Sequence, residues 1–109
     1  MSKKDTKLAR GSVVEEEIHL TLGELCQACC ASEEHVIAWV IEGVLEPIGE
    51  VPQNWRFTGQ SLRRARLAWS FTRDLEINPS GVALALDLLD EIAALQAQLY
   101  RIGARLHAK

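Results

Sequence analysis

Apolar residues at helical spacing predict a short first helix over about 22–30. They follow the i, i+3, i+4, i+7 order of a stripe that one helix face buries: Leu22, Leu25, Cys26 and Cys29. Thr21 precedes this stretch and Glu24 follows three residues later, which is the spacing of a capping box. The predicted helix therefore begins directly after Thr21.

A second helix is predicted over 32–42, after a turn at Ala31 and Ser32. Ser32 is a suitable N-cap, acidic residues follow it in the first turn, and Gly43 ends the helix. Two short helices joined by a tight turn form a helix-turn-helix. Two apolar stripes compete for its core face: one holds Val36, Trp39, Val40 and Gly43, and the other holds Val36, Ile37, Val40 and Ile41.

Two short strands are expected on either side of a loop that contains Gly and Pro, and they would close a wing. The first strand covers 44–47 and the second covers 53–57. Residues 13–20 are interpreted as a short strand or an extended lead-in. Thr58 then begins a third helix, which has apolar residues through Leu75.

The C-terminal part of the chain predicts one long helix. Asn78 is a good N-cap, and Pro79 is tolerated in the first helical turn. Apolar residues then alternate at spacings of three and four, the repeat of a coiled coil. Ala85 opens this seam, and the predicted dimerisation residues follow it: Leu88, Ile92, Leu95, Leu99, Ile102 and Leu106. The expected cover is a second copy of the chain in a homodimer, and packing in cis against the third helix is the alternative.

The length of the chain gives room for one domain and one extended helix. The chain has 109 residues, of which 48% are apolar and 25% charged, and such proportions are typical of soluble globular proteins. The predicted organisation is a flexible basic tail (1–12), a winged helix-turn-helix (13–58) and a helical, coiled-coil dimerisation region (59–109). No apolar run approaches the ~20 residues that span a bilayer, and no secretory signal is recognisable. We therefore expect a cytoplasmic protein that does not bind membranes.

Charge is segregated along the chain. No Lys or Arg occurs from Gly11 through Asn54, a stretch that holds nine acids: Glu15, Glu16, Glu17, Glu24, Glu33, Glu34, Glu42, Glu46 and Glu50. Basic residues return afterwards, at Arg56, Arg63, Arg64, Arg66 and Arg73. Arginines on the third helix could contact nucleic acid or acidic lipid, although a solvated face paired with acids is the commoner arrangement.

The three cysteines have two interpretations. Cys26 and Cys29 form a C-x-x-C spacing, and Cys30 adjoins them. Zinc needs four ligands, which only His19 and His35 could complete, so packing of the first helix is the preferred interpretation. The chain has no phosphate-binding Gly-rich loop and no nucleophile with an evident base. We therefore predict a non-enzyme without metal or cofactor.

The order of these elements resembles the MerR-type regulators, a superfamily with a winged helix-turn-helix followed by helices and a dimerising coiled coil. The resemblance rests on Leu22–Leu25, on the wing entry Gly43–Pro47 and on the return strand Asn54–Phe57. In that superfamily an aromatic residue at the position of Trp39 packs inward. The resemblance thus implies the fold class: mainly α, with a MerR-like winged helix-turn-helix, a short two-stranded wing, a helix and a coiled-coil helix.

A narrower resemblance is to the chaperone-modulator (CbpM) family. It rests on the segment Asp74–Ile92, with its Gly-Val-Ala-Leu-Ala-Leu stretch, and on Ser32-Glu33-Glu34. Members of that family bind the J-domain of CbpA, a DnaJ-like co-chaperone, and inhibit its co-chaperone and DNA-binding activities. The resemblance implies a protein partner of this kind.

The charges of the second helix argue against DNA binding and for a basic protein partner. A DNA reader needs cations on this helix, whereas here acids would face the phosphates and repel them. A J-domain presents a positively charged helix to DnaK, and an acidic helix complements it. The predicted partner-binding residues are Glu33, Glu34, His35, Ala38, Glu42 and Glu46. The alternatives are a MerR-type DNA-binding transcriptional regulator and, third, a cysteine-based metal or redox sensor.

Overall fold

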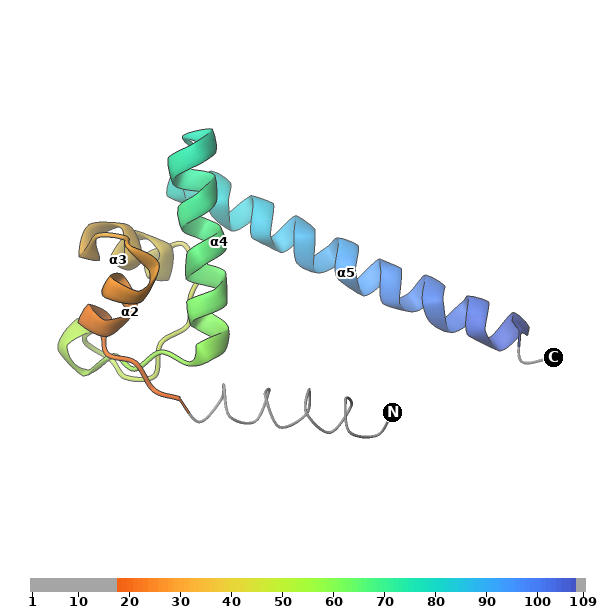
Figure 1. The fold of residues 1–109 in the computed structure, drawn as a ribbon, viewed down its shortest axis with the longest axis horizontal. Coiled ribbons are helices and arrows are strands. Elements are labelled where there is room, and N and C mark those ends of the chain that lie inside the picture. Colours follow the sequence, from red (N-terminus) through yellow and green to blue (C-terminus); the bar gives the residue numbers. More distant parts are fainter. Residues whose placement is uncertain (1–17, 108–109) are drawn as a thin grey trace.

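The computed structural model describes residues 18–107, with side chains through residue 104. Within that range the chain forms four α-helices and one 3-10 turn: α2 (Leu22–Cys29), α3 (Glu33–Ile41), η1 (Pro52–Asn54), α4 (Gly59–Leu75) and α5 (Pro79–His107). In Figure 1, α2, α3 and α4 form a head from which α5 extends as a long arm. The predicted tail (1–12) and most of the predicted lead-in (13–20) lie outside the described residues.

Local capping fixes the start of each predicted helix. At α2, the Glu24 N–H donates to Thr21 Oγ1 at 3.1 Å, and the Thr21 N–H donates to Glu24 Oε1 at 2.8 Å, so the capping box is confirmed. Ser32 Oγ accepts from the backbone N–H of His35 at the start of α3. Equivalent bonds to the side chains of Thr58 and Asn78 begin α4 and α5.

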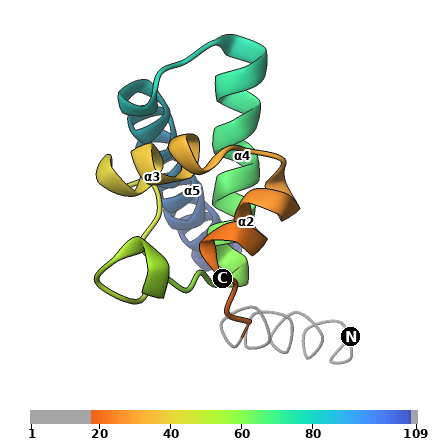
Figure 2. The same cartoon turned by 90° about the vertical axis from the view of Figure 1, so that its left-hand side faces the viewer.

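The helices enclose one core. α2 packs on α3 and α4, and α5 packs on the same two helices. Figure 2 shows α2 and α3 in front of the head, with α5 receding behind it. The largest fully buried side chains come from every one of these helices except α4 and from the loops: Leu25, Val36, Trp39, Leu45, Phe57, Val82 and Leu86. α4 contributes the small buried residues Ala65 and Ala68, which allow its neighbours to approach closely.

The orientation of α3 decides between the two apolar stripes. Trp39 is fully buried, whereas Ile41 is 75% exposed. Gly43, with a φ of 81°, ends the helix in the left-handed region, and the N–H of Val44 donates to Trp39 O at 2.8 Å. The inward aromatic expected from the MerR resemblance is confirmed.

The two predicted strands of the wing are not found among the described residues. Ile48 and Arg56 form a single antiparallel bridge with two hydrogen bonds of 2.9 Å, and Leu20 forms another bridge with Phe57. Proline provides no N–H for a ladder, and Pro47 and Pro52 occupy both arms of the loop. η1 and the left-handed Gly49 take up the rest of the loop, so pairing stops after one bridge.

Only the first turns of α5 belong to the core. Val82 and Leu86 are buried against the head, on a different helix face from the predicted seam. The seam residues with described side chains are between 49% and 68% exposed: Leu88, Ile92, Leu95, Leu99 and Ile102. Leu106 lies in the helix, but its side chain is outside the described ones. In the described part of the chain, these seam residues therefore do not pack against α4.

Candidate functional site

The outward face of α3 carries two parallel rows of side chains. Since Val36 and Trp39 are buried, the residues opposite them on the helix face solvent. Positions four apart are stacked along a helix, which gives one row of Glu33, Ile37 and Ile41 and a second row of Glu34, Ala38 and Glu42. Hereafter we call these six residues the α3 surface. Four of the six predicted partner-binding residues belong to it.

The first row borders a hollow of about 300 Å³. Its wall on the α3 side consists of Glu33 and Ile37. The remaining lining residues come from the start of α2 and from η1: Thr21, Leu22, Gly23, Pro52 and Gln53. Ile41 continues the row one turn beyond Ile37, so an apolar strip of α3 leads into this hollow, which we call the α3–η1 groove.

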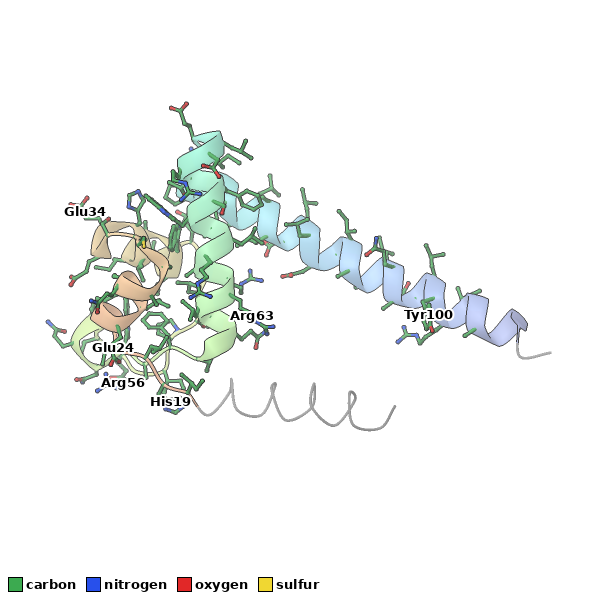
Figure 3. The ribbon with its side chains drawn as sticks, in the orientation of Figure 1. His19, Glu24, Glu34, Arg56, Arg63 and Tyr100 are labelled. Atoms are coloured by element: carbon green, nitrogen blue, oxygen red, sulfur yellow. The ribbon has the colours of Figure 1, made fainter. Side chains whose placement is uncertain are left out.

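The second row is the more acidic one. Glu34 and Glu42 are exposed, and Ala38 between them is half-buried. In Figure 3, Glu34 projects from the head on the side away from Arg63 of α4. No Lys or Arg occurs within residues 18–54 to offset these carboxylates. The α3 surface therefore presents negative charge beside an apolar strip.

Two predicted partner contacts lie elsewhere. The His35 ring is half-buried within the head, where its Nδ1 lies 2.7 Å from Ser32 Oγ and its centroid 5.0 Å from that of Trp69. Glu46 lies beyond the turn at Gly43, in a separate polar hollow of about 370 Å³ that Arg64 and α5 also line. The structure thus does not bring these two side chains to the α3 surface.

Arg56, the first cation after the acidic stretch, lies near the N-terminal cap of α2. Its Nη1 donates to Trp55 O at 2.8 Å, and Figure 3 shows Arg56 and Glu24 at the same end of the head. The pKa of Glu24 is lowered, mainly by hydrogen bonds from the backbone and hydroxyl of Thr21 and to a lesser extent by the charge of Arg56. Arg56 therefore acts electrostatically on the α2 cap.

The cysteines serve the packing of α2. Cys29 is buried and Cys26 half-buried, and burial raises the pKa of both thiols, which keeps them in the uncharged form. Cys30 is exposed at the left-handed C-cap, with a φ of 62°. Among the described residues, no group of three or more His, Cys, Asp or Glu side chains is arranged to hold a metal ion.

The exposed stripe of α5 begins at Leu84, one residue before the predicted seam. Leu84, 61% exposed, extends it toward the head by one turn before Leu88. Beside the stripe, Leu89 and Tyr100 are exposed as well. Among residues 18–107, no helix combines the length and apolar character needed to cross a membrane.

Sequence reasoning missed two exposed apolar residues, Ile41 and Leu84. The signal for Ile41 was present: a residue two positions after a buried one lies about 200° around the helix axis, because successive residues turn by about 100°. An inward Trp39 therefore requires an outward Ile41. Leu84 was missed because the predicted heptad repeat begins at Ala85, one residue later.

Comparison with known proteins places the fold in a family. Residues 20–103 match the family described as MerR HTH family regulatory protein. The chaperone modulatory protein CbpM of Coxiella burnetii (strain Dugway 5J108-111) is 42% identical over 93 residues, which cover 85% of this chain and 88% of that protein. The protein of the same name from Pseudomonas putida (strain W619) is 35% identical over 89 residues, covering 82% and 88%. Neither description is that of an enzyme. This chain belongs to the CbpM family of chaperone modulatory proteins, which shares the MerR-type helix-turn-helix.

Proposed function

We propose that the protein binds the J-domain of a DnaJ-like co-chaperone, CbpA, through the α3 surface and inhibits its co-chaperone and DNA-binding activities. The observation that carries this proposal is the exposed acidic face of α3, within a stretch of the described chain that has no Lys or Arg from residue 18 to 54. J-domains use a positively charged helix to engage DnaK. A protein that covers this helix competes with DnaK directly.

The composition of the α3 surface suits a reversible regulatory complex. The exposed carboxylates of Glu34 and Glu42 attract a positive partner over several ångströms and select it by charge. Ile41, 75% exposed, provides apolar contact area at the C-terminal end of the same face. Charge would therefore set the rate and specificity of encounter, and the apolar contact would hold the complex.

A homodimer formed through α5 completes the proposal. The stripe from Leu84 to Ile102 extends about 27 Å at ~1.5 Å per residue, and its side chains are half or more exposed. Monomers rarely expose so long a continuous apolar stripe, because burial of apolar area is favourable by about 25 cal/mol per Å². A second copy carries the same stripe and is the proposed cover. On this proposal the region from 59 onward joins the copies, and the preceding helix-turn-helix binds the partner.

A second candidate is a DNA-binding transcriptional regulator, which the match to a helix-turn-helix regulatory family supports. The helix that would enter the major groove is α3, and it contains Glu33 and Glu34 but no Lys or Arg. Carboxylates facing a phosphate backbone release no counterions and are repelled by it. The charge of α3 therefore favours the co-chaperone over DNA.

The test is a calorimetric titration of the full-length protein with the J-domain of the co-chaperone from the same organism, with duplex DNA as the control ligand. The proposal predicts micromolar or tighter binding to the J-domain, weaker at higher salt, and no binding to the duplex. Absence of J-domain binding together with salt-sensitive DNA binding would establish the regulator instead. A co-chaperone assay with DnaK then measures whether saturation with the protein removes the stimulation.

A further inference from the structure

We propose that the α3–η1 groove receives an apolar side chain from the partner's basic helix, with Ile37 and Ile41 as the anchors on this chain. The inference rests on the proposed function and deepens it. It commits to one kind of occupant: an amphipathic helix that has Lys or Arg on both flanks of an apolar row.

The shape of the groove supports this occupant. A volume of about 300 Å³ is at the low end of the range for ligand pockets, about 300–1,000 Å³, and gives room for a side chain. Gly23 leaves one wall without a side chain, and a Cβ added at this position would meet open space. Pro52 on the opposite side makes that wall stiff and apolar.

The apolar residues near the groove form a continuous approach to it. Ile37 lines the groove, and Ile41 is the next residue of its row. Val51, 45% exposed, adjoins Pro52 in sequence on the other side. Single exposed apolar residues are common on protein surfaces, but a row that ends in a hollow is the arrangement by which one helix binds along another.

Charge identifies the partner helix as basic. Glu33 stands on the rim of the groove, and Glu34 and Glu42 form the adjacent row. A cationic side chain on either flank of the partner's apolar row would meet one of these carboxylates. A second copy of this same surface, duplex DNA or an anionic membrane would each place negative charge against negative charge.

The experiment fills the groove while leaving the acids intact. Gly23→Leu puts a side chain on its open wall, and Leu has a higher helix propensity than Gly. The matched control is Ala28→Leu. Ala28 is exposed, lies five residues after Gly23 in the same helix, and is not among the residues that line the groove. We expect Gly23→Leu to weaken J-domain binding at least tenfold, about 1.4 kcal/mol, with Ala28→Leu unchanged. Ile41→Ser should weaken it similarly, and it changes a residue outside the core.

The outcomes separate this inference from the proposed function. Wild-type protein that fails to bind the J-domain overturns both. Wild-type protein that binds, with Gly23→Leu and Ile41→Ser binding equally well, overturns the groove alone. If the far-ultraviolet circular dichroism of Gly23→Leu shows lost helix, Ile41→Ser decides by itself, because a 75% exposed side chain contributes little to folding.

Discussion

The α3 surface and the exposed stripe of α5 are both uncovered in this chain, but they differ in chemistry. The α3 surface has three exposed carboxylates, Glu33, Glu34 and Glu42, beside a short apolar row. The α5 stripe is apolar over about five turns of helix at ~3.6 residues per turn, from Leu84 to Ile102. One surface attracts a partner of opposite charge, whereas the other attracts any surface that can exclude water from it.

This difference indicates what each surface binds and how tightly. A long apolar stripe pairs best with another of the same kind, and in the proposed homodimer such pairing would add to the stability of the protein. The proposed partner of the small acidic face is a complementary basic helix, and such a complex would depend on salt and remain reversible. The predictions that follow separate the two surfaces, beginning with the largest effect.

The buried side of α3 holds the helix on the head, and Trp39→Ala removes the largest side chain from that side. Trp39 is fully buried, and truncation of a buried Trp costs about 3–5 kcal/mol. We expect the head to unfold or melt far below the wild-type temperature, with loss of J-domain binding. Thermal unfolding by circular dichroism measures this change. Ile41→Ala, on the outer face of the same helix, should change the free energy of unfolding by only about 0.5 kcal/mol or less.

Lysine substitutions in the α5 stripe test whether it mediates self-association. Ile92→Lys with Leu95→Lys should weaken self-association at least about 100-fold, near 3 kcal/mol, because two ammonium groups from each copy would have to be buried between the helices. Ala97→Lys, exposed on the other side of α5, is the control and should leave the association unchanged. Sedimentation equilibrium measures the constants. A wild-type protein that is monomeric at every concentration, or a double variant that associates normally, contradicts the proposed dimer.

The α3 surface is tested by neutralisation. Glu33→Gln, Glu34→Gln and Glu42→Gln in one chain should lower J-domain affinity about tenfold or more and flatten its salt dependence, since the attraction is electrostatic. Self-association through α5 should not change. The control neutralises exposed acids elsewhere: Glu76→Gln, Asp87→Asn and Glu91→Gln. Equal affinities for both triple variants would show that the acids of α3 have no special role.

The smallest effect concerns the capping box beside the α3–η1 groove. Thr21→Ala should cost about 1 kcal/mol of stability near neutral pH. The pKa of Glu24 lies below its ordinary value of 4.5 because Thr21 donates hydrogen bonds to its carboxylate. The ionised Glu24 carboxylate therefore adds to the free energy of unfolding above pH 4.5, and this contribution is lost as the pH falls through the lowered pKa. Unfolding curves measure both effects. The curves of the wild type and of a Glu24→Gln variant, which lacks the charge, should converge in acid, because the backbone N–H of Thr21 is the main cause of the lowered pKa and is present in both. Parallel curves at every pH would contradict this account.

The parts of the fold that depend on neighbours in sequence could be predicted. Helix starts are set by Thr21, Ser32, Thr58 and Asn78, each of which bonds a backbone N–H three residues on. The predicted strands of the wing are not confirmed: their residue types suit pairing, but the prolines remove hydrogen-bond donors and only single bridges form. Trp39 could not be oriented from α3 alone, since two apolar stripes fit it. Packing of α3 on α2 and α5 decides between them.

The candidate site was predictable in charge but not in shape. The acids of α3 were evident from the absence of Lys and Arg, and Glu33, Glu34 and Glu42 lie where the periodicity puts them. His35 turns toward Trp69, a contact between helices that no local pattern contains. The groove likewise needs three segments together, α2, α3 and η1, so only the structure reveals it.

The most direct test of the two-surface account is an amide chemical-shift map of the full-length protein titrated with the J-domain. The account predicts changes at residues 21–23, 33–42 and 51–53, and unchanged shifts along 92–102. Changes centred on 92–102, with the α3 surface silent, would contradict it and would place the co-chaperone on the arm of α5.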